Sequence, residues 1–305
     1  MSQASIVVVG SSNTDMIIRV ERIPRPGETI LGGEFATAAG GKGANQAVAA
    51  ARAGGLVAFV AKVGTDVFGD QAVAGFVRDG IHVEQIGRDP EAASGVALIF
   101  VARDGENSIA VASGANARLS PHDIARAQPA FERAGTLLMQ LETPLETVEA
   151  AAQLAAKLRL RVILNPAPAQ PLPDSLLRLV SILTPNESEA ELLTGQPVAN
   201  QAGAIQAAKV LHARGVPTVL ITLGARGCLV STAELAEFVP GFPVSAVDTT
   251  AAGDIFNGAL AVALGEGQPI LEAARFASAA AAISVTRPGA QPSAPTRQEI
   301  ERLLG

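Results

Sequence analysis

The sequence predicts an α/β fold: a central, mostly parallel β-sheet with helices on both faces, together with a small β-sheet lid. Three features lead to this prediction. Short β-branched runs alternate with helix-length amphipathic segments along most of the chain, as repeated strand–helix units do. Polar residues directly follow several of these runs, at the strand ends where open α/β sheets bind ligands. Two other pieces have the tight polar turns of antiparallel hairpins.

The main sheet is predicted to begin at Ser5–Val9, because this β-branched run ends at Gly10 as a buried parallel strand would. Its later strands are predicted at Val57–Val60, Leu137–Leu141, Arg161–Leu164, Ile182–Leu183 and Thr218–Thr222. The helices between them are predicted at Gln46–Ala53, Gln71–Asp79, Leu145–Leu158, Glu187–Leu193, Ala202–Arg214 and Glu272–Val285.

Two hairpins do not fit this alternation. Met16–Val20 and Thr29–Leu31 flank a turn rich in Pro and Gly, and Gly95–Val101 and Ser108–Ala112 flank the turn at Asp104-Gly105. We assign both to a lid over the strand ends, built from about residues 13–36 and 94–112. No internal repeat or linker divides the chain, so residues 1–305 are predicted to form a single domain that carries this lid.

The composition argues against several classes of function. Hydrophobic residues make up 48% of the chain, charged residues 17%, and the formal net charge is −6. This acidic balance without a basic run speaks against a nucleic-acid or membrane partner. Trp and Tyr are absent and Phe is sparse, so the chain offers no aromatic platform for stacking bases. The lone cysteine, Cys228, is predicted to be a buried strand thiol in a reducing, cytoplasmic compartment. His82, His122 and His212 are expected to be surface or helix residues.

The stretch Val247–Leu260 carries the strongest chemical signal. Small residues lead into a segment with helical spacing of its apolar side chains. The first amides of such a helix have no partner within the helix, so they can receive an anion. Asp254 lies in the same first turn, where a carboxylate suits proton abstraction from a hydroxyl that attacks phosphorus. The alternative is an ordinary acidic residue at a helix N-terminus.

A second glycine-rich stretch, Gly40–Asn45, opens a predicted helix. It is not a Walker A loop, because Lys42 is followed by Gly43, and it lacks the third glycine of a dinucleotide fingerprint. Exposed amides and the Asn45 side chain can bind the hydroxyls of a small polyhydroxy ligand. A plain helix start with flexible glycines is the alternative.

Polar residues at other strand ends also have two interpretations each. Asn13 and Asp15 follow the first strand, and Glu142 follows a later one; they can hold hydroxyls or serve as ordinary turn residues. Glu189 lies three residues after Asn186, which is either a capping box or part of a site for hydrated Mg²⁺. The segment Thr222–Gly227 either turns beneath a nucleotide or makes a β-hairpin.

Taken together, these motifs resemble the ribokinase/PfkB family of carbohydrate kinases over nearly the whole chain. The residues that carry the resemblance are Asn13-Thr14-Asp15, Pro26-Gly27-Glu28-Thr29, Gly40-Gly41-Lys42-Gly43-Ala44-Asn45-Gln46, Asn165-Pro166-Ala167, Thr184-Pro185-Asn186-Glu187 and Asp248–Gly258. The resemblance implies a ribokinase-like, Rossmann-type sandwich and ATP-dependent phosphorylation of the 5-hydroxyl of D-ribose. It also implies a homodimer formed through the lid.

The resemblance further implies a role for each matching residue. Asp254 would be the general base, beside an anion hole formed by the amides of Ala251, Ala252 and Gly253. The sugar would be held by Asn13, Asp15, Gly41, Lys42, Gly43, Asn45, Glu142 and Asp254. The ATP site would include Asn186, Thr222, Gly224, Arg226, Gly227, Gly253 and Ser278, with Glu189 near Mg²⁺. A K⁺ ion would be held, mostly through carbonyl oxygens, by Asp248, Thr250, Ser284, Arg287, Gly289 and Ser293.

Two other hypotheses stand beside this one. Within the same chemistry, the acceptor is another small sugar, such as 2-deoxyribose or a fructose-type sugar, or a nucleoside. In a different class, the chain is a non-catalytic sugar-binding regulator that kept the fold. An intact Asp254 beside Gly253 speaks against the regulator, and the missing dinucleotide fingerprint disfavours an oxidoreductase.

Overall fold

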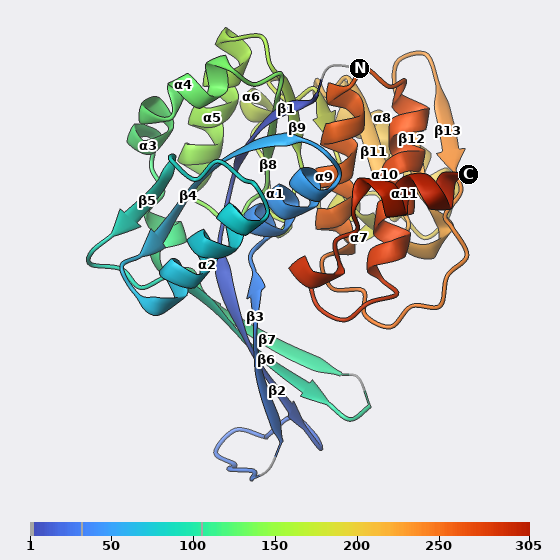
Figure 1. Ribbon diagram of the computed structural model, residues 1–305. Helices are drawn as coiled ribbons and strands as arrows, with labels where there is room; N and C mark the ends of the chain where they lie inside the picture. Colours follow the sequence, from blue (N-terminus) through green and yellow to red (C-terminus); the bar gives the residue numbers. More distant parts are fainter. Residues whose placement is uncertain (1–2, 32, 105) are drawn as a thin grey trace.

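The computed structural model describes residues 3–31, 33–104 and 106–305. A broad α/β body carries a narrow second sheet that projects from it (Figure 1). The predicted turn at Asp104-Gly105 lies partly outside the described residues, because Gly105 is not among them.

The main sheet confirms the predicted α/β class. In the described part of the chain it has nine strands in the order β13-β12-β11-β10-β9-β8-β1-β4-β5. Neighbours from β10–β11 to β4–β5 pair in parallel, and only β11–β12 and β12–β13 pair antiparallel. Their bounds are β1 Ser5–Val9, β4 Leu56–Gly64, β5 Ile86–Asp89, β8 Thr136–Met139, β9 Arg161–Leu164, β10 Ile182–Leu183, β11 Thr218–Thr222, β12 Cys228–Ser231 and β13 Ala236–Val239.

Helices cover both faces of this sheet, and each face has its own apolar cluster. Strand β1 shows the division: Ile6 and Val8 belong to one cluster, while Val7 and Val9 belong to the other, because successive side chains of a strand point to opposite faces. The first face is covered by α1 Lys42–Arg52, α2 Val67–Arg78, α9 Ala252–Gly265, α10 Ile270–Ser284 and α11 Arg297–Leu304. The second is covered by α3 Pro121–Arg126, α4 Gln128–Glu132, α5 Leu145–Lys157, α6 Asp174–Leu177, α7 Glu187–Thr194 and α8 Gln201–Ala213.

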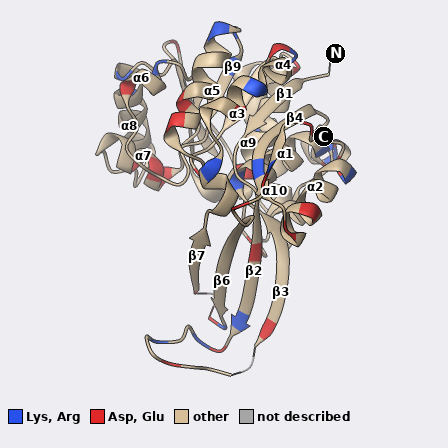
Figure 2. Ribbon diagram, turned by 90° about the vertical axis from the view of Figure 1, so that its left-hand side faces the viewer, with Lys and Arg blue, Asp and Glu red and all other residues tan. Residues whose placement is uncertain are grey.

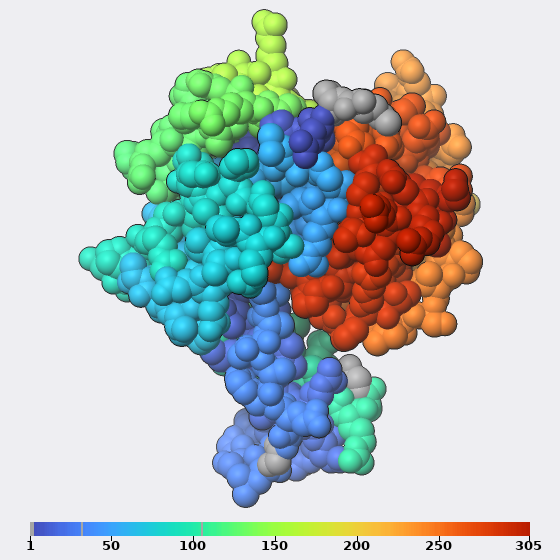
Figure 3. All heavy atoms as spheres, in the orientation of Figure 1, coloured from blue at the N-terminus to red at the C-terminus, as the bar shows by residue number. Residues whose placement is uncertain are grey.

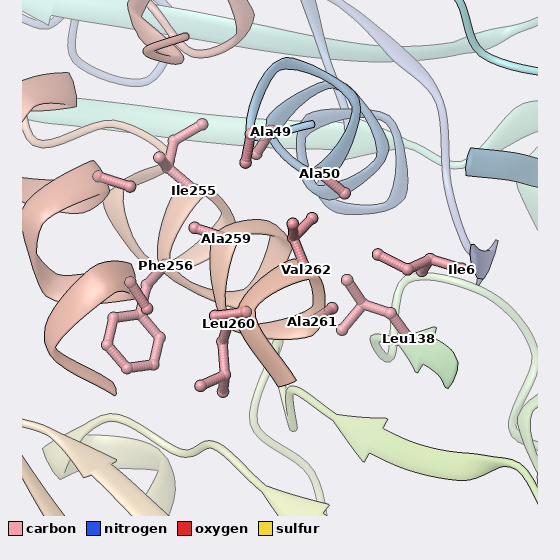
Figure 4. Close-up of a cluster of buried hydrophobic side chains, with 14 of the residues drawn as sticks. Ile6, Ala49, Ala50, Leu138, Ile255, Phe256, Ala259, Leu260, Ala261 and Val262 are labelled. Carbon is pink, nitrogen blue, oxygen red and sulfur yellow. The ribbon is translucent and has the colours of Figure 1, made fainter. Parts of the chain in front are cut away.

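Helices α1 and α9 pack closely because their contact surfaces are made of small residues. Figure 4 shows Ala49 and Ala50 of α1 facing Ala259 and Val262 of α9. A Cβ added at Gly258 would lie 2.6 Å from the Ala49 Cβ. The glycine therefore permits an approach that any larger residue would prevent. This contact matters for function, because both helices begin at the candidate site.

The second sheet has four strands in the order β3-β2-β6-β7 in the described residues. Their bounds are β2 Asn13–Val20, β3 Glu34–Gly40, β6 Gly95–Ala102 and β7 Asn107–Ala112. Figures 2 and 3 show it as a thin layer that stands away from the body, which leaves much of both its faces uncovered. We refer to it below as the small sheet.

Both faces of the small sheet carry exposed apolar side chains. Phe35 and Leu98 lie on one face, because Phe35 pairs with Ile18 and Ile18 pairs with Phe100, two residues beyond Leu98 on the same strand. Ile109 and Val111 lie on the face that carries Asp15. These four side chains are between 49% and 67% exposed. Such a concentration of exposed apolar surface is typical of an interaction site.

Several element predictions were wrong in detail. Thr29–Leu31 is not a strand; the partner of β2 is Glu34–Gly40, which is largely exposed and rich in small residues, so no apolar alternation marked it. Helix α1 begins at Lys42, four residues before the predicted start. Helix α2 begins at Val67, because Asp66 caps it by accepting from the Gly69 amide.

Other strands and helices had no clear signal. Strand β5 and the short helices α3, α4 and α6 were not predicted, since each is too short to show a period. Cys228 is buried in β12, as expected. His82 and His122 are exposed, and His212 is half-buried in α8. No helix in the described ranges is long and apolar enough to cross a membrane.

Candidate active site

The site is built where strand β1 meets the start of helix α1, and glycines make this contact possible. A Cβ on Gly43 would lie 2.5 Å from the Ser11 amide nitrogen, and one on Gly41 would lie 2.7 Å from the Asn13 amide nitrogen. Gly41 also has a φ of +89°, which favours glycine. The glycine-rich stretch is therefore a close-packed crossing that brings the first turn of α1 to the end of the sheet, rather than a flexible loop.

Glu142, which follows the neighbouring strand β8, hydrogen-bonds to both sides of this contact. Its Oε2 accepts from the Lys42 amide at 3.0 Å and from the Ser11 hydroxyl at 2.5 Å. The carboxylate thereby satisfies one of the free amides at the start of α1. Sequence reasoning gave Glu142 a role at the site but gave none to Ser11, whose signal was its place among the polar residues that follow β1.

Asp254 lies in the first turn of α9 and is buried. Its Oδ2 accepts from Asn45 Nδ2 at 2.9 Å, and its Oδ1 accepts from Gln46 Nε2 at 3.0 Å. Burial is the largest influence on the Asp254 carboxyl and raises its pKa, whereas the Lys42 cation and the two amides act in the opposite direction. A buried carboxylate with a raised pKa is better matched to proton abstraction near neutral pH than an exposed one.

The residues just before Asp254 combine a strained backbone with the free amides of a helix start. Ala251, the residue before the helix, has a φ of +60°, a left-handed conformation that is costly for a residue with a Cβ. The amides that follow begin helix α9 and carry the positive end of its dipole. Among them the Ala252 amide donates a long bond to the Thr249 carbonyl at 3.3 Å.

A cavity of about 170 Å³ lies in front of this turn. It is lined by Lys42, Asn165, Ala167, Thr184, Asn186, Glu189, Thr222, Thr249, Ala251, Ala252, Gly253, Asp254 and Asn257. The base candidate and the predicted anion hole therefore share one cavity with Lys42. Burial lowers the pKa of the Lys42 ammonium, but the carboxylates of Asp254, Glu142 and Glu189 outweigh this and raise it, so the side chain stays cationic.

Other predicted sugar residues surround the start of α1. Gly40 leaves room for the Asp15 carboxylate, because a Cβ there would overlap both of its oxygens. Desolvation, with the carboxylates of Glu142 and Asp254, raises the pKa of Asp15 to about 6. Asn13 Oδ1 accepts from Asn116 Nδ2 at 2.7 Å, a partner that sequence reasoning missed.

One atom of this group points to a ligand. Asn45 Oδ1 is buried and has no hydrogen-bond partner among the described residues, although buried polar atoms are nearly always paired. Because the Asn45 amide nitrogen already binds Asp254, its oxygen is left to accept a hydroxyl. The predicted residues Asn13, Asp15, Gly41, Lys42, Gly43, Asn45 and Glu142 are thus brought together around the first turn of α1 and its neighbouring strand ends.

The predicted nucleotide residues are only partly gathered. Asn186, the N-cap of α7, and Thr222, at the end of β11, line the cavity and form an isolated parallel β-bridge. The turn that follows Thr222 leads into the β11–β12 hairpin, with Arg226 paired to Glu187 and Gly227 packed against the Val239 carbonyl. Gly224, Arg226 and Gly227 do not line the cavity.

Ser278 also lies apart from the cavity. It is buried in α10 beside Cys228, whose pKa burial raises to about 11 while the contact with Ser278 opposes the rise. Its predicted place in the ATP site stays a prediction.

Glu189 lines the cavity and caps helix α7 at the same time. Its Oε2 accepts from the Asn186 amide at 2.8 Å, and Asn186 Oδ1 accepts from the Glu189 amide at 2.9 Å. The two interpretations of this pair are therefore compatible. Among the described residues no group of three or more His, Cys, Asp or Glu side chains could hold a metal ion. A Mg²⁺ ion here would take few protein ligands, as Mg²⁺ on a nucleotide does.

The predicted K⁺ residues lie in the loop before α9 and in the stretch from the end of α10 to Ser293, and Asp248 connects the two segments. Its Oδ1 accepts from the Thr250 amide at 2.9 Å, and its Oδ2 accepts from the Gly289 amide at 2.8 Å. The hydroxyls of Ser284 and Ser293 donate to nearby carbonyls, and the Arg287 side chain pairs with Glu299. The donor set therefore fits a cation held by backbone oxygens rather than by these side chains.

The fold and the site define an α/β protein that binds a small ligand at the strand ends, beside a buried carboxylate and a helix start. Comparison with known proteins gives its family. The family model described as pfkB family carbohydrate kinase matches residues 3–297. The chain therefore belongs to the pfkB family of carbohydrate kinases.

Relatives within this family include enzymes for two sugars. The ribokinase of Haemophilus influenzae is 50% identical over 300 residues, which cover 98% of each chain. The deoxyribokinase of Salmonella typhimurium is 39% identical over 300 residues, again 98% of each chain. The solved structure of Arabidopsis thaliana ribokinase complexed with ribose and ATP has a TM-score of 0.92 at 35% identity and covers 99% of each chain.

Proposed function

We propose that this chain is a ribokinase, which transfers the γ-phosphoryl group of ATP to the 5-hydroxyl of D-ribose. The observation that carries the proposal is the Asp254 carboxylate, buried in the first turn of α9 and held by Asn45 and Gln46. The 50% identity to the Haemophilus influenzae ribokinase over nearly the full length supports the choice of sugar.

In the proposed reaction Asp254 accepts the proton of the attacking hydroxyl. The sugar oxygen forms a bond to the γ-phosphorus as the bond from phosphorus to the β–γ bridging oxygen breaks, and ADP leaves with that electron pair. The amides of Ala251, Ala252 and Gly253 stabilise the negative charge on the transferring group. Lys42, which the surrounding carboxylates keep protonated, adds a positive charge to the same cavity.

Sugar binding is assigned to the residues around the start of α1. Asp15 and Asn13 suit vicinal hydroxyls, and the unpartnered Asn45 Oδ1 accepts another. Asn45 would then contact the bound sugar through Oδ1 and Asp254 through Nδ2, which places the sugar close to the Asp254 carboxylate. In the complex the small sheet would act as a lid that keeps water from competing as phosphoryl acceptor.

ATP is placed in the cavity with Asn186 and Thr222, and Glu189 is placed near its Mg²⁺. Mg²⁺ would supply charge neutralisation at the phosphates. A K⁺ ion between the loops of Asp248 and Gly289 would stabilise the turn that leads into the anion hole.

We also propose that two copies of the chain associate through the small sheet. Phe35, Leu98, Ile109 and Val111 expose apolar surface on both of its faces, and a partner sheet would remove that surface from water. The acidic charge and the single cysteine agree with a cytoplasmic enzyme without nucleic-acid or membrane partners.

The second candidate is a kinase of 2-deoxyribose, which the 39% identity to a deoxyribokinase favours. ADP release with ATP and Mg²⁺ across a panel of sugars and nucleosides, with and without K⁺, separates the two. The ribokinase proposal expects D-ribose to give the highest kcat/KM. A higher value with 2-deoxyribose would move the assignment to the second candidate. Tight sugar binding without any ADP release would indicate a regulator.

A further inference from the structure

Asp254 belongs to a chain of buried polar side chains that hydrogen-bond to one another. Three members of this chain, Asn165, Thr184 and Asn257, also line the cavity, whereas Gln46 and Gln140 do not. The central member of the chain is Gln46, which is 0% exposed. Gln46 Nε2 donates to Asp254 Oδ1 at 3.0 Å and to Asn165 Oδ1 at 3.1 Å, and Gln46 Oε1 accepts from Gln140 Nε2 at 2.6 Å. Burial of an amide is costly unless its polar atoms are paired, and here both ends of Gln46 are paired.

The pairing also fixes which end of Gln46 faces the carboxylate. A rotation that exchanged its oxygen and nitrogen would place Oε1 against Asp254 Oδ1 and Asn165 Oδ1, three oxygens without a proton between them. Gln46 is therefore held as a donor toward Asp254. Asn45 donates to the other carboxylate oxygen, so two adjacent residues of α1 determine the orientation of the carboxylate on α9.

The chain continues from Gln46 to the first turn of α9, which contains Gly253 and Asp254. Asn165 Nδ2 donates to the Thr184 carbonyl at 3.1 Å, and Thr184 Oγ1 donates to Asn257 Oδ1 at 2.6 Å. Asn257 Nδ2 then donates to the Gly253 carbonyl at 2.8 Å. One connected set of hydrogen bonds thus holds the base candidate and the proposed anion hole against the ends of β9 and β10.

We propose that Gln46 is a positioning residue for the base, and that it keeps the Asp254 carboxylate ionised and aimed at the substrate. The proposal rests on the proposed function, since it requires Asp254 to take a proton. A hydrogen bond from a neutral amide favours the ionised form of a carboxylate without adding a competing charge. In a buried site such bonds are stronger than in water.

Several groups around Asp254 oppose ionisation of its carboxyl, so a hydrogen bond from Gln46 has an effect to counteract. Lys42 on α1 favours the ionised form, and burial opposes it together with the carboxylate of Glu142 after β8. Asp15 on β2 and Glu189 on α7 add further negative charge, since Asp254 raises the pKa of each. Loss of the hydrogen bond from Gln46 would therefore shift the protonation equilibrium of Asp254 toward the protonated carboxyl, which cannot accept a proton.

The test compares pH profiles of the full-length enzyme with ATP, Mg²⁺ and its best acceptor. Gln46→Met keeps the length of the side chain and removes all three of its hydrogen bonds. We expect its kcat to fall roughly 10- to 100-fold and the acid limb of kcat/KM to move up by about one pH unit, which corresponds to one hydrogen bond to a charged group. KM for both substrates should stay within about twofold, because Gln46 does not line the cavity.

Three further variants keep the test decisive. Gln140→Met frees Gln46 Oε1 and should give a smaller shift in the same direction, which also covers the case in which Gln46→Met does not fold. Thr136→Val in β8 is the control, since the Thr136 hydroxyl is buried and has no partner among the described residues; its profile should match wild type. In an Asp254→Asn background, Gln46→Met should cause no further loss of kcat.

Two results would overturn the proposal. One is a Gln46→Met enzyme with lower kcat and lower stability but an unmoved acid limb, which indicates a merely structural role. The other is an equal loss of kcat in the Asp254→Asn background. Failure of the proposed function is recognised separately, because it appears in the wild type as the absence of ADP release with any acceptor.

Discussion

The close contact between α1 and α9 makes Gly258→Ala a sharp test of how the site is assembled. A Cβ at position 258 would lie 2.6 Å from the Gln46 carbonyl oxygen, 2.6 Å from the Ala49 Cβ and 2.8 Å from the Ala50 amide nitrogen. Two of these atoms belong to the backbone of α1, so no rotamer change relieves the overlap. The helices must separate by several tenths of an ångström.

The expected magnitude follows from two opposing terms. Overpacking typically costs about 1–3 kcal/mol, and contacts with backbone place this site in the upper half of that range. Replacement of glycine by alanine inside a helix returns about 1 kcal/mol. We therefore expect Gly258→Ala to lower the free energy of unfolding by about 1–2 kcal/mol. Activity should also fall, because Asn45 and Gln46 move relative to Asp254.

Urea denaturation and kcat measurements check this prediction against a matched variant. Gly75 lies inside α2, and a Cβ there would have only Arg78 Nη2 nearby, at 3.6 Å. Gly75→Ala should therefore raise stability by up to about 1 kcal/mol and leave kcat unchanged. A Gly258→Ala protein as stable and as active as Gly75→Ala would refute the packing argument.

Three further predictions concern the sugar site, the small sheet and the cation loops. The pKa of Asp15 is raised to about 6, so its carboxylate becomes protonated as pH falls below that value. KM for the sugar should therefore rise between pH 7 and 5 in the wild type but not in Asp15→Asn. A flat wild-type profile would argue against Asp15 as a sugar ligand. The double variant Phe35→Glu/Leu98→Glu should sediment as a monomer. The control Val77→Glu, which changes an exposed apolar residue of α2, should sediment like wild type. Identical sedimentation of the two variants and the wild type would rule out association through the face of the small sheet that carries Phe35 and Leu98. Asp248→Ala should lose most of the activation by K⁺ while keeping its K⁺-independent rate, and undiminished activation in steady-state assays would place the cation elsewhere.

The sequence was most informative where a local pattern of residue types is compatible with one kind of secondary structure. The β-branched run Ser5–Val9 became strand β1 with the bounds predicted for it. Asp254 was placed correctly in the first turn of a helix, because small residues before an apolar helical period leave few other arrangements. Its proposed role stays a prediction, as do the roles of the other site residues.

The sequence was least informative where tertiary packing decides the structure. Strand β3 was assigned to Thr29–Leu31 instead of Glu34–Gly40, since a strand exposed on both faces shows no alternation. The start of α1 was placed too late, because glycine normally disfavours helix interiors and only the close approach of Gly10 and Ser11, just after β1, explains Gly43. Gln46 could not be recognised as a partner of Asp254, which lies 208 residues later in the chain.

The most direct test of the account is the turnover of Asp254→Asn with ATP, Mg²⁺ and D-ribose, measured beside sugar binding by calorimetry. Asparagine keeps the shape of the side chain but cannot accept the proton. General base catalysis contributes about 10²- to 10⁴-fold, so kcat should fall by at least about a hundredfold, or about 2.7 kcal/mol of barrier, while the Kd for ribose changes little. A variant that retains more than a tenth of the wild-type kcat would contradict the assignment of Asp254 as the base.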